Sequence, residues 1–287
     1  MAIDFMYALP YLLLWVAFGV SMLTSRRFVG LTFTAVSLAA AVVVGIVEWA
    51  GLAVLTLFAG ACLAAVRSEF PRAHRTLAWG VVVILTAALA TNQVPWIHNV
   101  LVLDREFVSA SSADFTLYWN YDKGFAGILL YSLCVQPQGN TDWNRAIVAT
   151  GEIVIPTLVV VLGTATAVGY LAWDPKWPAI LGVWVPANLL LTCISEETIF
   201  RGILQRQSES FLRGRVPAPA LVALLVCAVA FGVVHIAGGT TYVLLSTLAG
   251  IGYGAAYYVT GRVEAGILVH FLFNLSHLIL FTYPFAA

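Results

Sequence analysis

Residues 195–202 read SEETIFRG and place three charges directly after an uncharged apolar stretch at 177–194. Glu197 and Arg201 are four residues apart, so on a helix they share one face and can form an ion pair. Glu196 would lie about 100° further round the same helix. One acid is therefore expected to pair with the arginine, which leaves the other acid to face a cavity.

Two later motifs repeat the four-residue spacing and supply the other groups of a reactive site, FGVVH at 231–235 and HFLFN at 270–274. A carboxylate, two imidazoles and a carboxamide suit the activation of water against a carbonyl group. The carboxylate would take the proton of the water, and one histidine would help to hold the water or carry the proton on. The other histidine and the asparagine would donate to the developing oxyanion. The candidate catalytic residues are Glu196, His235, His270 and Asn274.

A glutamate with two histidines is also a ligand set of catalytic zinc. Glu196, His235 and His270 are therefore candidate metal ligands, with zinc as the cofactor. The sequence leaves a zinc-assisted and a metal-free hydrolysis both open. It contains no HExxH motif, which excludes the metal-binding helix of the soluble zinc proteases.

The composition indicates which elements must carry these residues. Of the 287 residues, 61% are hydrophobic and only 10% are charged, against roughly 25% charged in a soluble domain. Long uncharged runs suit transmembrane helices of roughly 20 residues, and their continuous character excludes a membrane β-barrel. We expect an all-α, polytopic bundle of about 8–10 spans. The runs are 5–23, 28–47, 49–66, 76–94, 146–173, 177–194, 219–237, 240–260, 265–283 and a shorter one at 124–135.

The expected domains are an N-terminal part, 1–123, with plain helices and an interfacial loop, and a catalytic membrane core, 124–287. Arginine-bearing loops mark the cytoplasmic side of a membrane protein. If the short run at 124–135 crosses the membrane, they place the Glu-Glu-Arg segment at the cytoplasmic face of a cell-membrane protein, with its cavity facing the cytoplasm. The balanced net charge argues against a nucleic-acid partner. The arginines that mark this side are Arg26, Arg27, Arg67, Arg72, Arg75, Arg206, Arg213, Arg215 and Arg262.

The three motifs EETIFR, FGVVH and HFLFN, in this order, resemble those of the type II CAAX prenyl endopeptidases, also called the CPBP or Abi family. The resemblance covers roughly residues 146–287. It implies a helical intramembrane protease with a conical cavity that opens to the cytosol and the inner leaflet, and a membrane-anchored protein or peptide as substrate. It also implies that Glu196 and His235 activate water, that His270 and Asn274 build the oxyanion site, and that Glu197 and Arg201 support them.

Two other functions are compatible with the polar residues. Intramembrane acids and histidines also form proton relays in transporters, although the sequence shows no inverted repeat of the kind that builds many transporters. A non-catalytic scaffold or a bacteriocin self-immunity factor is the other alternative. Asn188, which precedes the glutamates in the same apolar run, is a further candidate for the wall of the cavity.

Overall fold

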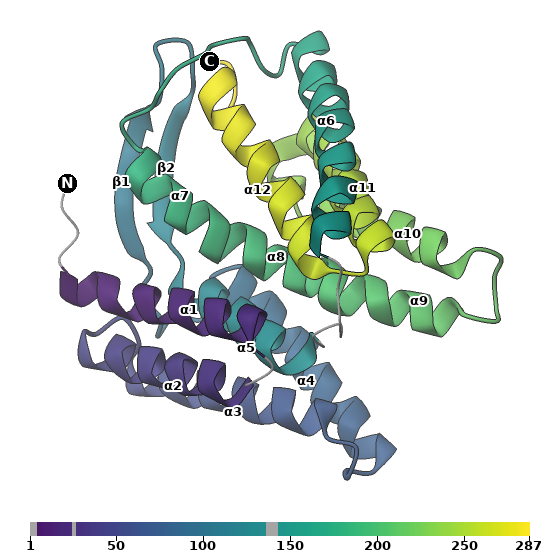
Figure 1. Cartoon of the computed structure of the whole chain (residues 1–287). Coiled ribbons are helices and arrows are strands. Elements are labelled where there is room, and N and C mark those ends of the chain that lie inside the picture. Colours follow the sequence, from purple (N-terminus) through teal and green to yellow (C-terminus); the bar gives the residue numbers. More distant parts are fainter. Residues whose placement is uncertain (1–4, 25–26, 136–142) are drawn as a thin grey trace. The chain divides into compact units, whose positions relative to one another are not determined.

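The computed structural model describes residues 5–24, 27–135 and 143–287. Arg26 and the side chain of Arg27, which enter the orientation argument, lie outside the described residues. Every apolar run expected from the sequence contains helix (Figure 1). The helices outside 181–212 are α1 (Phe5–Leu23), α2 (Arg27–Val43), α3 (Trp49–Val66), α4 (Arg72–Ala90), α5 (Tyr121–Cys134), α6 (Trp143–Ala167), α10 (Pro219–Val233), the 3-10 turn η3 (Ile236–Gly238), α11 (Gly239–Thr260) and α12 (Val263–Leu280).

Within the described part of the chain, six helices are long and apolar enough to cross a membrane. Two shorter apolar helices, Phe28–Val43 and Pro219–Val233, accompany them. The expected all-α polytopic fold is confirmed, and the chain is a multi-pass membrane protein. The six long helices are Phe5–Leu23, Trp49–Val66, Arg72–Ala90, Trp143–Ala167, Ile236–Thr260 and Val263–Leu280.

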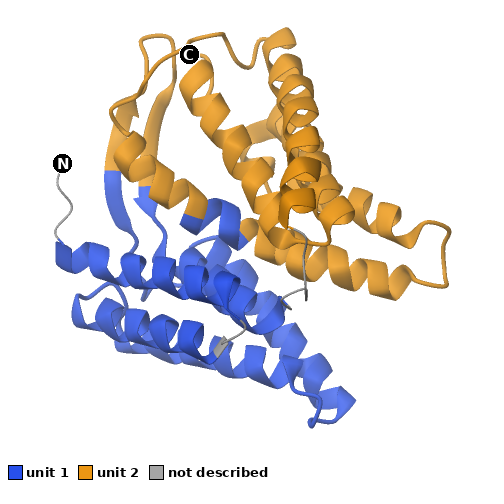
Figure 2. Cartoon of the chain, viewed as in Figure 1, with its two compact units in different colours: residues 1–102, 118–137, 190–195 blue, residues 103–117, 138–189, 196–287 orange. Residues whose placement is uncertain are grey.

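The chain forms two compact units, each assembled from separated parts of the sequence (Figure 2). Unit 1 contains residues 1–102, 118–137 and 190–195, and unit 2 contains residues 103–117, 138–189 and 196–287. These units group residues by contact and do not test a domain boundary between residues 123 and 124, which stays a prediction.

Helix α5 forms the core of unit 1. Helices α1, α2, α3 and α4 all contact it, and every residue from Tyr121 to Leu133 is buried except Lys123. A 14-residue helix is about 21 Å long, which is shorter than the hydrocarbon core of a bilayer at about 30 Å. The short apolar run at 124–135 is therefore a core helix surrounded by the N-terminal helices.

Helix α5 also holds the segment that leads into the glutamate pair. The hydroxyl of Ser195 donates to the carbonyl of Lys123 at 3.0 Å. A Cβ atom on Gly127 would lie 2.3 Å from Ser195 Oγ and 2.6 Å from Ser195 Cβ. Glycine at position 127 therefore permits a close approach that any other residue would prevent, and this contact fixes the chain immediately before Glu196.

One continuous helical segment, 181–212, carries the glutamates and runs through both units. It consists of α7 (Leu181–Pro186), the π-helix η1 (Ala187–Ile194), α8 (Ser195–Glu197), the π-helix η2 (Thr198–Gln205) and α9 (Arg206–Leu212). Long π-helical stretches are rare, and they occur frequently at functional sites. Both π-helices flank the glutamate pair.

Unit 2 packs α6, α10, α11 and α12 around a shared apolar core. Gly250 of α11 lies against α10, where an added Cβ atom would approach the Cα atom of Ala228 at 3.2 Å. This is the close helix packing that small residues at positions 250 and 254 favour.

A β-hairpin occupies the connection that we expected to be an interfacial loop. Strand β1 (Val100–Phe107) pairs with β2 (Asp114–Trp119). The runs VLVL at 100–103 and FTLYW at 115–119 are rich in β-branched and aromatic residues, which favour strands. The loop between the strands bonds the C-terminus through Ala113 N–H to the carbonyl of Phe285, at 3.1 Å.

Candidate active site

Glu197 is the centre of a buried charged cluster in unit 2. Its Oε2 accepts a hydrogen bond from Arg201 Nε at 2.8 Å, and the ion-pair side chains are both fully buried. Its Oε1 lies 3.0 Å from Nδ1 of His270, on α12. The ion pair expected from the sequence is present. The contact with His270 shows that the same carboxylate also holds an imidazole 73 residues away.

The surroundings of this cluster explain how α12 approaches the carboxylate so closely. Gly266 precedes His270 by one helical turn, and a Cβ atom there would lie 3.0 Å from Glu197 Oε2 and 3.3 Å from the carbonyl oxygen of Tyr253. The Tyr253 ring stacks on the His270 ring, with centroids 4.3 Å apart and an interplanar angle of 13°. The His270 ring is therefore fixed by one hydrogen bond and one stacked face.

Aromatic rings enclose the guanidinium of Arg201. Its Cζ lies 5.9, 5.4 and 5.9 Å from the ring centroids of Phe200, Phe231 and Tyr253. These distances are within the range of a cation–π interaction. Arg201 Nη1 and Nη2 are buried without a hydrogen-bond partner among the described residues. The rings and the Glu197 carboxylate are therefore the groups that stabilise this buried charge.

Phe231 brings the two candidate histidines to one place. The His235 and His270 rings lie 4.8 and 5.8 Å from the Phe231 ring, centroid to centroid. His235 Nδ1 is 2.7 Å from the carbonyl oxygen of Phe231. A carbonyl only accepts, so Nδ1 of His235 carries the proton and Nε2 of the neutral ring is the basic nitrogen. The phenylalanine of the FGVVH motif therefore contacts both histidine rings and accepts a hydrogen bond from one of them through its carbonyl.

Glu196 lies apart from the buried pair and is half-buried. The Glu196 carboxylate and the Tyr242 phenol lie near each other. The Tyr242 ring packs edge-on against the His235 ring, with centroids 5.4 Å apart. Tyr242 therefore lies near both Glu196 and His235, while His270 is held by Glu197.

Asn274 contacts a residue of the helix that carries the glutamates. Its Nδ2 donates to Oδ1 of Asn188 at 3.2 Å, and both side chains are half-buried. Asn274 follows His270 by one turn on α12. Asn188 was only a secondary candidate in the sequence, and its contact places it directly beside a predicted site residue.

The candidate metal ligands do not form a compact ligand set. Among the described residues, no three His, Cys, Asp or Glu side chains are grouped so that they could hold a metal ion. Glu197 engages Nδ1 of His270 and the Phe231 carbonyl engages Nδ1 of His235, which leaves Nε2 of each ring as the nitrogen that could bind a metal. The present arrangement does not fit a zinc site built from Glu196, His235 and His270, and we derive no catalytic step through a metal.

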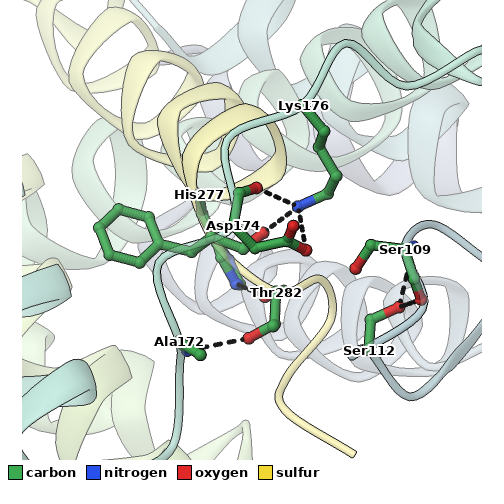
Figure 3. Close-up of polar contacts among 8 residues, drawn as sticks. Ser109, Ser112, Ala172, Asp174, Lys176, His277 and Thr282 are labelled. Atoms are coloured by element: carbon green, nitrogen blue, oxygen red, sulfur yellow. Dashed lines mark hydrogen bonds and ion pairs between the residues drawn. The ribbon is translucent and has the colours of Figure 1, made fainter.

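A polar clasp holds the C-terminal end of α12 (Figure 3). Lys176 N–H donates to the carbonyl of Ile279 at 2.8 Å, and Asp174 N–H donates to that of Leu280 at 2.9 Å. Lys176 Nζ donates to the carbonyl of Phe281 and lies 3.2 Å from Asp174 Oδ2. The last carbonyls of a helix have no partner within the helix. In the helix that carries His270 and Asn274, the clasp supplies hydrogen-bond donors to the carbonyls of Ile279 and Leu280.

The acid of the clasp is stabilised in its ionised form. The pKa of Asp174 lies below its ordinary value of 3.8, first because of the neighbouring Ser109 hydroxyl and then because of Lys176. The Ser109 hydroxyl is buried and lies near Asp174 (Figure 3). Its Oγ makes no hydrogen bond with standard distance and angle among the described residues. A depressed pKa adds stability that is complete above pH 3.8 and is lost as the pH falls through the folded-state pKa.

We expect Lys176→Met to lower the free energy of unfolding by about 1–3 kcal/mol at pH 7, because it removes hydrogen bonds from a charged donor. Thermal melting of the purified protein in detergent measures the change, with Arg72→Met as a control for an exposed cation at the start of α4. The difference from wild type should shrink as the pH falls below 3.8. Equal melting of wild type and Lys176→Met at pH 7 would refute the clasp.

Several residues of the site were not predicted from the sequence. Gly266 and Tyr253 contact the cluster from α12 and α11, and Tyr242 contacts His235. The position of Gly266 could have been recognised in the sequence, because it lies one turn before His270 on the same helical face. Tyr253 and Tyr242 had none, since their contacts arise from the packing of α11.

Comparison with known proteins agrees with the motifs. The family model described as Type II CAAX prenyl endopeptidase Rce1-like matches residues 176–276. The matched region contains all three motifs together with Asn188 and Lys176. This match confirms the family resemblance. No curated protein and no solved structure matches the chain significantly.

Proposed function

We propose that this chain, which is similar over residues 176–276 to the type II CAAX prenyl endopeptidases, hydrolyses a peptide bond of a membrane-anchored protein or peptide. The observation that carries the proposal is the buried Glu197 carboxylate, which joins Arg201 to His270. A scaffold has no evident need for a fully buried arginine–carboxylate–imidazole chain, because buried charges are costly. Such a chain orients an imidazole as the aspartate does in the hydrolytic triads.

In the proposed reaction, Glu196 accepts the proton of the attacking water, and Nε2 of His235 helps to hold that water. Nδ1 of His235 is engaged by the Phe231 carbonyl at 2.7 Å, which directs the basic nitrogen Nε2 away from its own helix. The water adds to the scissile carbonyl carbon to give a tetrahedral oxyanion. The proton then passes to the leaving amine as the C–N bond breaks.

The oxyanion would be bound by His270 and Asn274. His270 donates Nδ1–H to Glu197. To donate from Nε2 to the oxyanion as well, the ring must be the protonated imidazolium. Glu197 and Arg201 then serve as the groups that orient this ring. Zinc assistance stays a proposal from the sequence alone, and the metal content of purified active protein checks it.

A comparison of protein termini in whole cells can identify the substrate. Mass spectrometry would compare the termini of membrane proteins in cells that produce the wild-type protein, the Glu196→Gln variant or neither. Protein termini that appear only with the wild-type protein support the proposed function and identify the cleaved bond. Identical termini in all three samples would contradict it, and a transporter or a scaffold would then be favoured.

The proposed orientation places the arginine-bearing end of unit 2 in the cytoplasm. Arg262 Cζ lies 3.9 Å from the Trp143 ring centroid, so the start of α6 and the end of α11 share this end. The 22-residue helix α11 spans about 33 Å and separates Arg262 from His235. A cavity open to the cytoplasm must therefore extend from the Arg262 end towards His235.

Single cysteines, introduced into a variant without the four native cysteines, test both the proposed orientation and the side from which the cavity opens. We expect Arg213→Cys to react with a membrane-impermeant thiol reagent only in inside-out vesicles, and Ala110→Cys on the hairpin loop only in right-side-out vesicles. Both positions are exposed. His235→Cys should react with the reagent in the same vesicles as Arg213→Cys, that is, in inside-out vesicles. Labelling of His235→Cys together with Ala110→Cys would overturn the cytoplasmic opening of the cavity.

A further inference from the structure

Two polar contacts join the helical segment 181–212 to the C-terminal part of the chain within unit 2. Asn274 Nδ2 donates to Asn188 Oδ1 at 3.2 Å, and Trp184 Nε1 donates to the hydroxyl of Tyr283 at 3.0 Å. Trp184 and Asn188 are four residues apart and so share a helical face. Trp184 is almost completely buried. Together with these two contacts, the Glu197–His270 contact at 3.0 Å joins the same two segments, so the Asn188–Asn274 contact is one of several that fix their register.

Asn188 also has a defined relation to the glutamates. It is the second residue of the π-helix η1 and precedes Glu196 by eight residues on the same continuous helical segment. Asn188 thus links a residue of the proposed oxyanion site to the segment that carries the proposed base.

We infer that Asn188 is a positioning residue that accepts one N–H of the Asn274 carboxamide and so orients the other N–H of Nδ2 towards the oxyanion; this inference rests on the proposed function. A carboxamide presents donors on one side and an acceptor on the other. If the Asn274 amide rotated by half a turn while Asn188 kept its orientation, the Asn274 carbonyl oxygen would face Asn188 Oδ1, and no proton would lie between the two oxygens. The contact at 3.2 Å therefore disfavours the orientation that would present a carbonyl oxygen to the oxyanion.

The effect should appear in the chemical step and not in substrate binding. Removal of a whole oxyanion donor costs about 10²–10³-fold in kcat. Asn188→Ala leaves the donor present but unoriented, so we expect kcat to fall by about 10–100-fold and KM to stay unchanged. The assay uses a peptide that spans the bond identified by the comparison of termini, with purified protein in phospholipid vesicles. Asn144→Ala, an exposed asparagine of α6, is the matched control and should behave as wild type.

Asn188→Asp separates positioning from a general loss of structure. A protonated aspartate presents the same neutral carbonyl acceptor as asparagine, whereas an ionised aspartate adds a negative charge near the developing oxyanion. The ratio of the kcat of Asn188→Asp to that of wild type should therefore rise as the pH is lowered. The same ratio for Asn188→Ala should stay constant with pH. A purely structural role would not produce this pH profile.

The outcomes separate the inference from the function on which it rests. If wild type cleaves the peptide and Glu196→Gln does not, while Asn188→Ala retains the wild-type kcat, the inference fails and the proposed function stands. A raised KM with unchanged kcat would also overturn it, because Asn188 would then bind substrate. If Asn188→Ala does not fold, the pH profile of Asn188→Asp decides, and a constant ratio refutes the inference. An inactive wild type would refute the proposed function itself.

Discussion

Glu196→Gln is expected to abolish hydrolysis while the fold is preserved. Glutamine keeps the size and shape of the side chain but its amide does not accept the proton of the attacking water. General-base catalysis contributes about 10²–10⁴-fold, so kcat should fall at least about 100-fold. Glu196 is half-buried and lies outside the Glu197–Arg201–His270 cluster. The substitution should therefore leave thermal stability close to that of wild type.

A matched glutamate in another helix controls for the loss of a carboxylate as such. Glu152 lies exposed on α6, and Glu152→Gln should keep full activity. Normal turnover by purified Glu196→Gln would remove Glu196 from the mechanism. The base would then have to be found elsewhere in the site, and Glu197 would be the next residue to test.

Glu197→Ala and Arg201→Ala are expected to act mainly on stability. Each variant leaves one fully buried charge without its ion-pair partner, and breaking a buried pair costs about 3–5 kcal/mol. Glu197→Ala also removes the acceptor of His270 Nδ1, at 3.0 Å. Both variants should therefore give low yields and melt at lower temperatures than wild type.

A double variant allows the ion pair to be tested even if the single variants give too little protein. Replacing both charges, as Glu197→Gln with Arg201→Met, removes the pair without leaving an isolated charge. Buried pairs replaced by neutral side chains are often tolerated, so the double variant should melt above Arg201→Ala. The loss in the double variant should also be smaller than the sum of the losses in Glu197→Gln alone and Arg201→Met alone. Single variants that melt like wild type but are inactive would instead assign chemistry to the pair.

The sequence predicted the local part of this site well. The spacing of Glu197 and Arg201 was sufficient to predict their ion pair, because residues four apart meet on a helix. The long apolar runs likewise predicted the helices, including the helical segment that carries the glutamates. The partner of His270 was beyond such reasoning, since Glu197 is 73 residues away. Only the packing of α12 against the glutamate-bearing segment, permitted by Gly266, brings them together.

Other features depend on long-range packing and were missed for the same reason. The clasp joins Lys176 to the carbonyl of Phe281, 105 residues away. The π-helical winding of η1 and η2 has no signature in hydrophobic periodicity. The β-hairpin was treated as an interfacial loop because its aromatic residues also suit a membrane interface. Its strand-forming residues were an available signal that received too little weight.

The most direct test of the account is cleavage in ¹⁸O-labelled water by purified protein in phospholipid vesicles. The substrate is the peptide that spans the bond identified by the comparison of termini, and mass spectrometry reads the products. We predict that the wild-type protein yields a new carboxyl terminus that contains one ¹⁸O atom. Glu196→Gln should yield no product above the protein-free control. Absence of cleavage by the wild-type protein, or equal cleavage by Glu196→Gln, would contradict the proposal that Glu196 activates water in this membrane protein.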